Sequence, residues 1–251
     1  MILRNISAPL IHRYKLAKPL LDLIRIGHIV DEDGNKLCKK KYKKPEDLTI
    51  VMCHNYTETP LFEESLQLHG INDYVVLGQD RKEWYNLIKI RLVREYLLRR
   101  LCQTKYLLHC DAKDVILWED PQRIVDIFES TGLDLMFMST SYTGGYVCMP
   151  TVREWTESIY NKRYINSGVY IGKPDFMLKV LTEASEYCAT EPELSLNRYR
   201  RLRKRGTELC KRCPQFPYGS PDDQDIFRFI HQQYYPEMGI DTKNEIAYRN
   251  P

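Results

Sequence analysis

The chain has 251 residues, of which 43% are hydrophobic and 28% charged, and its net charge is +3. This length is near the upper size that one hydrophobic core can support, so one large domain is expected. No stretch approaches the roughly 18 to 20 apolar residues that a membrane-spanning helix needs, and the first residues do not follow a signal-peptide pattern. The composition therefore predicts a soluble, cytoplasmic protein and excludes an integral membrane protein.

Basic residues are concentrated in two segments. Residues 1–45 contain 11 Lys or Arg against 4 Asp or Glu, and residues 198–213 contain 8 against 1. The rest of the chain is therefore acidic. This distribution is typical of a catalytic domain that binds a metal and holds an anion at its edges, although solvated helical faces explain each segment equally well.

The eight cysteines are scattered along the chain, which favours reduced thiols over a disulfide framework. Only Cys210 and Cys213 have the spacing of metal ligands. A structural zinc site there would need two more ligands, and Cys188 and His231 are the nearest candidates.

The first 45 residues are expected to form a basic accessory segment, followed by an organised domain over residues 46–251. Within the segment, Pro19–Ile26 has the apolar spacing of a helix, residues 31–35 resemble a turn, and a basic run ends at Pro45.

From residue 46 onward, short apolar runs alternate with amphipathic stretches. Strands are predicted at Leu48–Cys53, Tyr74–Leu77, Tyr106–Leu108, Val115–Leu117 and Leu133–Met138, and helices at Pro60–His69, Leu87–Leu101 and Pro121–Glu129. This alternation predicts an α/β fold with a mostly parallel central sheet flanked by helices. Ligands of such sheets lie beyond the carboxyl ends of the strands.

Three polar motifs follow predicted strands or precede a predicted helix. Asp111 and Asp114 come directly after an apolar strand, and paired carboxylates suit Mg²⁺ or Mn²⁺, although a simple turn also explains them. Asn166, in Asn-Ser-Gly before a β-branched run, can contact sugar hydroxyls or form an ordinary turn. Asp222 and Asp223 precede a helical pattern, where they can cap the helix or act on an acceptor.

In this order, Asp-x-x-Asp, Asn-Ser-Gly and Asp-Asp-Gln resemble the glycosyltransferase domain of the multifunctional procollagen lysyl hydroxylases and, more distantly, the procollagen galactosyltransferases. The resemblance spans about residues 46–250 and implies a GT-A (Rossmann-like) fold. It implies that Asp111 and Asp114 bind Mn²⁺ (or Mg²⁺) and the diphosphate of a UDP-sugar. It also implies that Asn166, Asp222 and Asp223 face the donor sugar and the acceptor.

The same resemblance extends to residues upstream of the aspartate pair. It implies that the donor nucleotide is contacted by Cys53, Asn55, Tyr56, Thr57, Trp84, Lys89 and Lys113. Trp84 would stack on uracil, and Lys89 would reach the phosphates. Lys113 replaces an aromatic residue of the family. The histidine that serves the family as third metal ligand, near the end of the domain, is absent here. Two alternatives stay open: a lower metal affinity, or Asp241 in place of the histidine.

The leading hypothesis is a metal-dependent hexosyltransferase that transfers a sugar from a UDP-sugar to an acceptor hydroxyl. The basic run Arg198 to Arg212 can contact a nucleic acid, so modified bases of viral DNA are one candidate acceptor beside protein, glycan and lipid. Two alternatives stay open: a non-catalytic module that binds a nucleotide or glycan, and a nucleotidyltransferase. The latter would leave the Asn-Ser-Gly and Asp-Asp-Gln motifs without a purpose.

Overall fold

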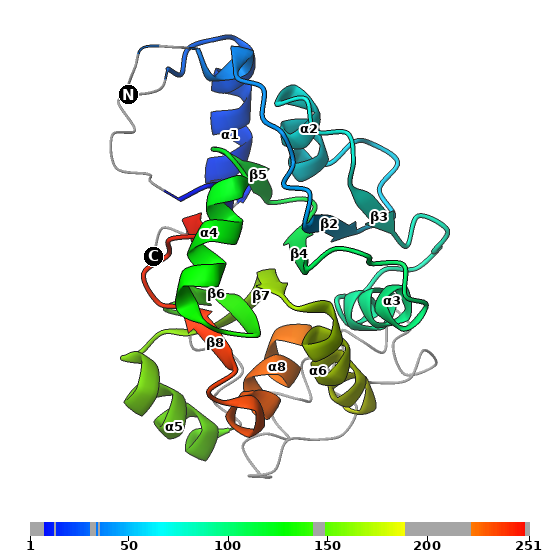
Figure 1. Ribbon diagram of the computed structural model, residues 1–251, viewed down its shortest axis with the longest axis vertical. Coiled ribbons are helices and arrows are strands. Elements are labelled where there is room, and N and C mark those ends of the chain that lie inside the picture. The colour runs from blue at the N-terminus through cyan, green and yellow to red at the C-terminus, as the bar shows by residue number, and fades with distance from the viewer. Residues whose placement is uncertain are drawn as a thin grey trace.

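The computed structural model describes residues 8–12, 14–30, 34, 36–142, 149–188 and 222–248 (Figure 1). The strands are β1 (Leu10–His12), β2 (Leu48–Cys53), β3 (Val75–Leu77), β4 (Tyr106–Asp111), β5 (Val115–Leu117), β6 (Leu135–Thr140), β7 (Tyr164–Gly172), β8 (Met238–Asp241) and β9 (Ala247–Tyr248). The helices are α1 (Tyr14–Arg25), α2 (Leu61–Leu68), α3 (Leu87–Leu98), α4 (Gln122–Thr131), α5 (Pro150–Tyr160), α6 (Pro174–Glu186) and α8 (Asp223–Ile230), with short 3₁₀ turns η1 (Leu37–Lys39) and η4 (His231–Tyr234). Within these residues, no helix is long and apolar enough to cross a membrane.

Six strands form the central sheet, in the order β3-β2-β4-β7-β6-β8. The pairs β2–β3, β2–β4 and β6–β8 are parallel, whereas β7 is antiparallel to both of its neighbours. The predicted α/β fold with a mostly parallel sheet is therefore confirmed. Because β7 runs in the opposite direction, its first residues lie at the edge of the sheet where the other strands end.

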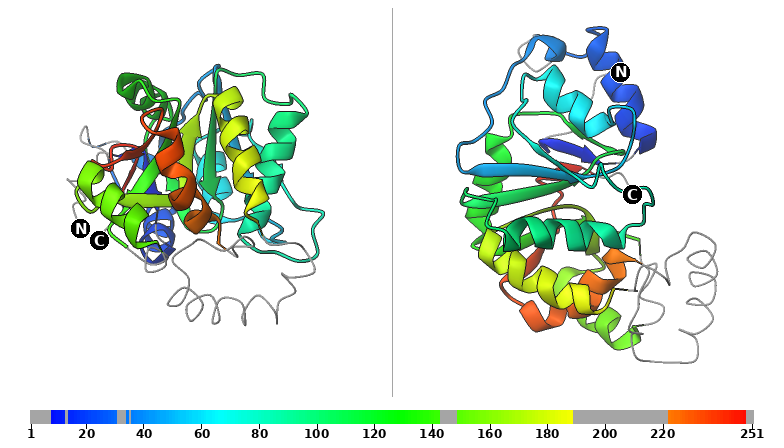
Figure 2. Two further views of the ribbon diagram at one scale, coloured as in Figure 1. Left: turned by 90° about the horizontal axis from the view of Figure 1, so that it is seen from below. Right: turned by 90° about the vertical axis from the view of Figure 1, so that its right-hand side faces the viewer.

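Helices cover both faces of this sheet (Figure 2). Helices α3, α6 and α8 pack on one face, in a core that contains Val51 and Leu107. Helices α2 and α4 pack on the other, in a core that contains Ile50 and Leu108. Successive strand residues point to opposite faces, so β2 and β4 supply apolar side chains to both cores and read as uninterrupted apolar runs.

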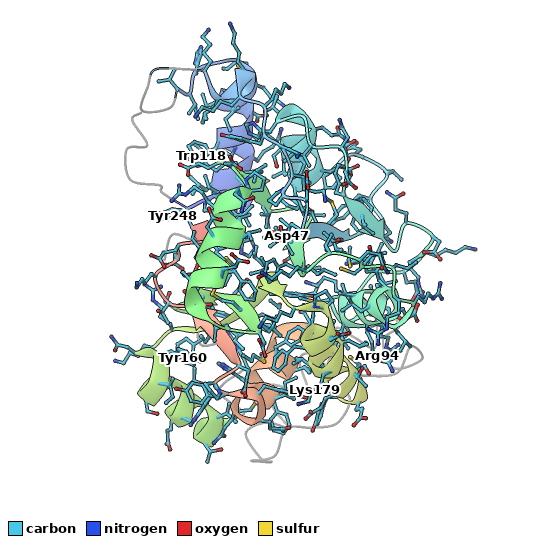
Figure 3. All side chains as sticks on the ribbon, in the orientation of Figure 1. Asp47, Arg94, Trp118, Tyr160, Lys179 and Tyr248 are labelled. Carbon is cyan, nitrogen blue, oxygen red and sulfur yellow. The ribbon has the colours of Figure 1, made fainter. Side chains whose placement is uncertain are left out.

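A second, three-stranded sheet, in the order β5-β1-β9, joins the start of the described chain to the region after β4. Strand β1 is antiparallel to β5, with His12 opposite Val115, and parallel to β9. Helix α1 packs beside it through a separate apolar cluster that includes Trp118, labelled in Figure 3. Residues on both sides of the expected boundary at residue 45 thus share one sheet.

Most predicted elements are confirmed, and one motif lies in a different setting from the one expected. The strand predicted over Leu48–Cys53 coincides with β2, and the predicted helices near residues 60, 87 and 121 correspond to α2, α3 and α4. Asn-Ser-Gly was expected before a strand, but it lies inside β7, whose nine residues are all buried. The pairing with β6 shifts within it, from Tyr170 opposite Phe137 to Asn166 opposite Met138. The polar Asn-Ser-Gly segment thus lies at a bulge of the strand, and its sequence resembles that of a loop.

His231 lies in a buried polar position between α5 and β8. Its Nε2 is 3.2 Å from the Tyr160 hydroxyl and 3.0 Å from the Met238 carbonyl oxygen, and its ring stacks on Tyr160. Burial lowers the pKa of His231 to about 4, although the Met238 carbonyl opposes the shift. The neutral imidazole is therefore the form that the fold stabilises.

This lowered pKa predicts a loss of stability in mild acid. The ordinary pKa of histidine is 6.5, so the unfolded chain takes up the proton first as the pH falls. The contribution of His231 is complete above that pH and decreases toward pH 4. When the pH falls from about 7 to about 5, the unfolding free energy of both proteins should decrease. We expect the decrease to be about 2 kcal/mol smaller in His231→Gln than in the parent, measured by urea denaturation. Parallel pH profiles for the two proteins would contradict this.

Candidate functional site

Two carboxylates stand at the end of the central strand β4. Asp111 is the last residue of β4, and Asp114 ends the short turn that leads into β5. Both side chains are partly open to solvent, with 28% and 34% of their surface exposed. The strand end therefore presents two oxygen donors at the edge of the sheet where α/β proteins bind ligands.

A histidine from the N-terminal strand lies beside this pair. The His12 Nε2 is 3.1 Å from Asp114 Oδ2, and the imidazole is buried. One donor atom each from His12, Asp111 and Asp114 lie within 4.8 Å of one another, and together they could hold a metal ion. One nitrogen and two carboxylate oxygens suit a divalent cation with further positions for water or phosphate.

The bulged segment of β7 closes on this group through Gly168. A Cβ atom at Gly168 would lie 2.8 Å from His12 Nε2 and 2.9 Å from Asp111 Oδ2. Any side chain there would occupy the space between the two donor atoms. Glycine is therefore required by the close approach of the strand, and bulges of this kind are common beside functional sites.

Lys89 of α3 connects Asp111 to the start of α8. Its Nζ donates to Asp111 Oδ1 at 2.9 Å and lies 3.0 Å from Asp223 Oδ2. Burial opposes its charge, but the two carboxylates outweigh burial and raise the pKa of Lys89 well above its usual value. Lys89 is thus a cation, and it engages one oxygen of Asp111 while the other oxygen faces Gly168 and His12.

The predicted residues of β7 and α8 are also joined. Asn166 accepts a hydrogen bond from the Gly168 amide at 2.9 Å and donates to Gln224 Oε1 at 3.0 Å. Asp222 caps α8, because its side chain accepts a hydrogen bond from the backbone amide of Gln224 at 3.1 Å. Asn166 is therefore linked to the first turn of α8. The same turn contains Asp223, which forms the ion pair with Lys89.

Three residues predicted to contact the nucleotide line one cavity of about 340 Å³ next to the aspartate pair. They are Tyr56, Thr57 and Lys113, and Lys113 Nζ lies 5.8 Å from the centre of the Tyr56 ring. Lys18 of α1 forms part of the wall. The N-terminal segment thus borders this cavity and also contributes His12.

Three other residues predicted to contact the nucleotide are not among those that line this cavity, and each has contacts within the protein. The Cys53 side chain is buried in the core, and burial raises the pKa of its thiol. Asn55 donates to the Arg81 carbonyl at 3.0 Å. Trp84 packs on Gly78, where a Cβ would approach its ring to 2.9 Å.

Asp241 is not the third donor of this group. Its two carboxylate oxygens accept hydrogen bonds from the backbone amides of Glu245, at 2.9 Å, and Ile246, at 2.8 Å. It therefore closes the turn after β8. The third member of the group of possible metal donors is His12, 99 residues before Asp111 in the sequence. Sequence patterns missed it because only the pairing of β1 with β5 brings it to the aspartates.

The zinc and nucleic-acid predictions rest on residues outside the described part of the chain, namely Cys210, Cys213 and the run Arg198 to Arg212. The two auxiliary zinc candidates have local partners. Cys188 contacts the Ala184 carbonyl oxygen, and His231 contacts Tyr160 and Met238 as described above.

A scan of the chain against known protein families finds no match, and a search of curated proteins finds no similar sequence.

The Lys89 ion pairs give a prediction for stability. Lys89→Met removes the cation between two carboxylates, and breaking a buried ion pair by removing one partner costs about 3 to 5 kcal/mol. We expect a loss of this size in the urea unfolding free energy. The exposed Lys82→Met is the matched control and should change stability little. If Lys89→Met lost no more unfolding free energy than Lys82→Met, the buried ion pairs would not contribute to stability.

Proposed function

We propose that this protein is a metal-dependent glycosyltransferase that transfers a sugar from a UDP-sugar to an acceptor hydroxyl. The observation that carries the proposal is the position of Asp111. One of its oxygens lies in a group of possible metal donors, and the other is bound by Lys89, which also binds Asp223 at the start of α8. Groups suited to a diphosphate, a sugar and an acceptor thus meet at one edge of the sheet.

Asp111 and Asp114 are the residues that would hold Mn²⁺ or Mg²⁺. A divalent cation there would offset the negative charge that develops on the diphosphate leaving group. The donor set fits such an ion because carboxylates and water are the ligands that Mg²⁺ and Mn²⁺ prefer.

The cavity beside Lys113 is the proposed position of the nucleotide. Tyr56 offers an aromatic face and a hydroxyl, Thr57 offers a second hydroxyl, and the Lys113 ammonium can approach a phosphate. The volume of about 340 Å³ is at the lower end of the range for small-molecule sites.

Asn166 and the first turn of α8 are the proposed sugar and acceptor side of the site. In the transfer, the bond between the anomeric carbon and the diphosphate oxygen breaks, and the diphosphate leaves with the electron pair. The acceptor oxygen bonds to that carbon and gives its proton to a carboxylate, for which Asp222 and Asp223 are the candidates. Lys89 holds Asp223 in place for this side of the reaction.

The sequence resemblance supports the same assignment. The motifs that resemble the lysyl hydroxylase glycosyltransferase domains supply Asp111, Asp114, Asn166 and Asp223, and the contacts above connect these residues. The mixed α/β sheet agrees with the GT-A fold that we propose for the chain.

The test is release of UDP from a panel of UDP-sugars, with and without Mn²⁺. We expect metal-dependent release from one sugar, and a fall of at least about 100-fold in Asp111→Asn and Asp114→Asn because each removes a charged oxygen from the leaving-group side. Asp126→Asn, on the exposed surface of α4, is the matched control and should keep full activity.

Persistent UDP binding without release or transfer, even with protein and nucleic-acid lysates as acceptors, would replace the enzyme by a binding module. A product that carries a nucleotide instead of a sugar would identify a nucleotidyltransferase.

A further inference from the structure

We propose that His12 is the third protein ligand of the metal ion, so that the N-terminal strand β1 completes the site. This inference rests on the proposed binding of a metal by Asp111 and Asp114. It adds a ligand that neither the sequence motifs nor the family resemblance supplies, because the family's histidine ligand comes from near the end of its domain.

The His12 ring is buried beside the carboxylate of Asp114. The His12 side chain is about 5% exposed, and its Nε2 lies 3.1 Å from Asp114 Oδ2. Within the described residues, Nδ1 has no hydrogen-bond partner, so Nε2 is the nitrogen of this buried ring that has a polar neighbour. Nε2 is also the nitrogen that lies in the group with Asp111 and Asp114, where a metal ion would reach it.

Two separate features of the fold bring the ring to this position. Strand β1 pairs with β5 in a register that sets His12 opposite Val115, the residue after Asp114. Gly168 of β7 leaves the space between His12 and Asp111 empty of side-chain atoms. A Cβ atom there would lie only 2.5 Å from His12 Cε1, so even alanine would displace the imidazole or the strand.

Two consequences follow from a nitrogen ligand on β1. The ion would tie β1 to the end of β4 and thereby connect the small sheet to the central sheet. The site would also favour Mn²⁺ over Mg²⁺, because imidazole suits transition metals whereas Mg²⁺ prefers oxygen ligands and water.

The direct test uses the full chain, stripped of metal by a chelator and loaded with Mn²⁺ alone, without any sugar nucleotide. Electron spin echo envelope modulation detects nitrogen bound to Mn²⁺. We expect modulation from an imidazole nitrogen in the unaltered protein. Its absence from protein that binds Mn²⁺ would overturn the proposal without the need for a variant.

Variants show which residue supplies the nitrogen that is detected on Mn²⁺. His12→Gln should abolish the nitrogen modulation and weaken Mn²⁺ binding by about 10-fold or more, with a smaller change for Mg²⁺. His28→Gln, at an exposed histidine of the same segment, is the matched control and should retain both. Gly168→Ala should also weaken Mn²⁺ binding, since its Cβ would fill the space between two donors. Modulation that persists in His12→Gln would reject His12 as the ligand.

These measurements are independent of sugar transfer. Nitrogen modulation that depends on His12, without UDP release from any donor, would support the ligand and reject the proposed glycosyltransferase. Manganese-dependent UDP release without nitrogen modulation would support the enzyme and reject His12.

Discussion

The candidate site depends on the Asp111 carboxylate, whose two oxygens have different neighbours. One oxygen accepts from the buried ammonium of Lys89, and the other faces Gly168 and His12. The first contact fixes the rotation of the carboxylate, so the second oxygen is held at the open edge of the sheet. Without Lys89, the same side chain would be free to rotate toward solvent, and the group of donors would lose its geometry.

The antiparallel strand β7 makes this arrangement possible. A parallel strand at this place would end at the ligand-binding edge, whereas β7 begins there and passes its Asn-Ser-Gly segment along the end of β4. Asn166 then reaches Gln224 of α8, and Gly168 allows His12 and Asp111 to approach from either side. One strand thus connects the sugar side of the proposed site with the metal side.

The sequence predicted the local parts of this arrangement and missed the long-range ones. Apolar periodicity located β2, β4 and α3, because strand and helix patterns depend on neighbouring residues. It also identified Asp111 and Asp114, which follow one strand. The pairing of Lys89 with Asp223 joins residues 134 positions apart, and His12 reaches Asp114 only through the register of β1 with β5. No periodicity within one segment encodes such contacts.

The charge balance of the site explains why its parts belong together. Asp111, Asp114 and Asp223 carry three formal negative charges, and the Lys89 ammonium offsets one of them. Asp111 and Asp114 are partly buried, with 28% and 34% of their side-chain surface exposed, and one donor atom of each lies within 4.8 Å of the other and of His12. The proposed divalent cation would bind these carboxylates and offset their charge. Asp111 and Asp114 would hold this ion close to the cavity lined by Tyr56 and Lys113, where it would supply positive charge to a bound phosphate.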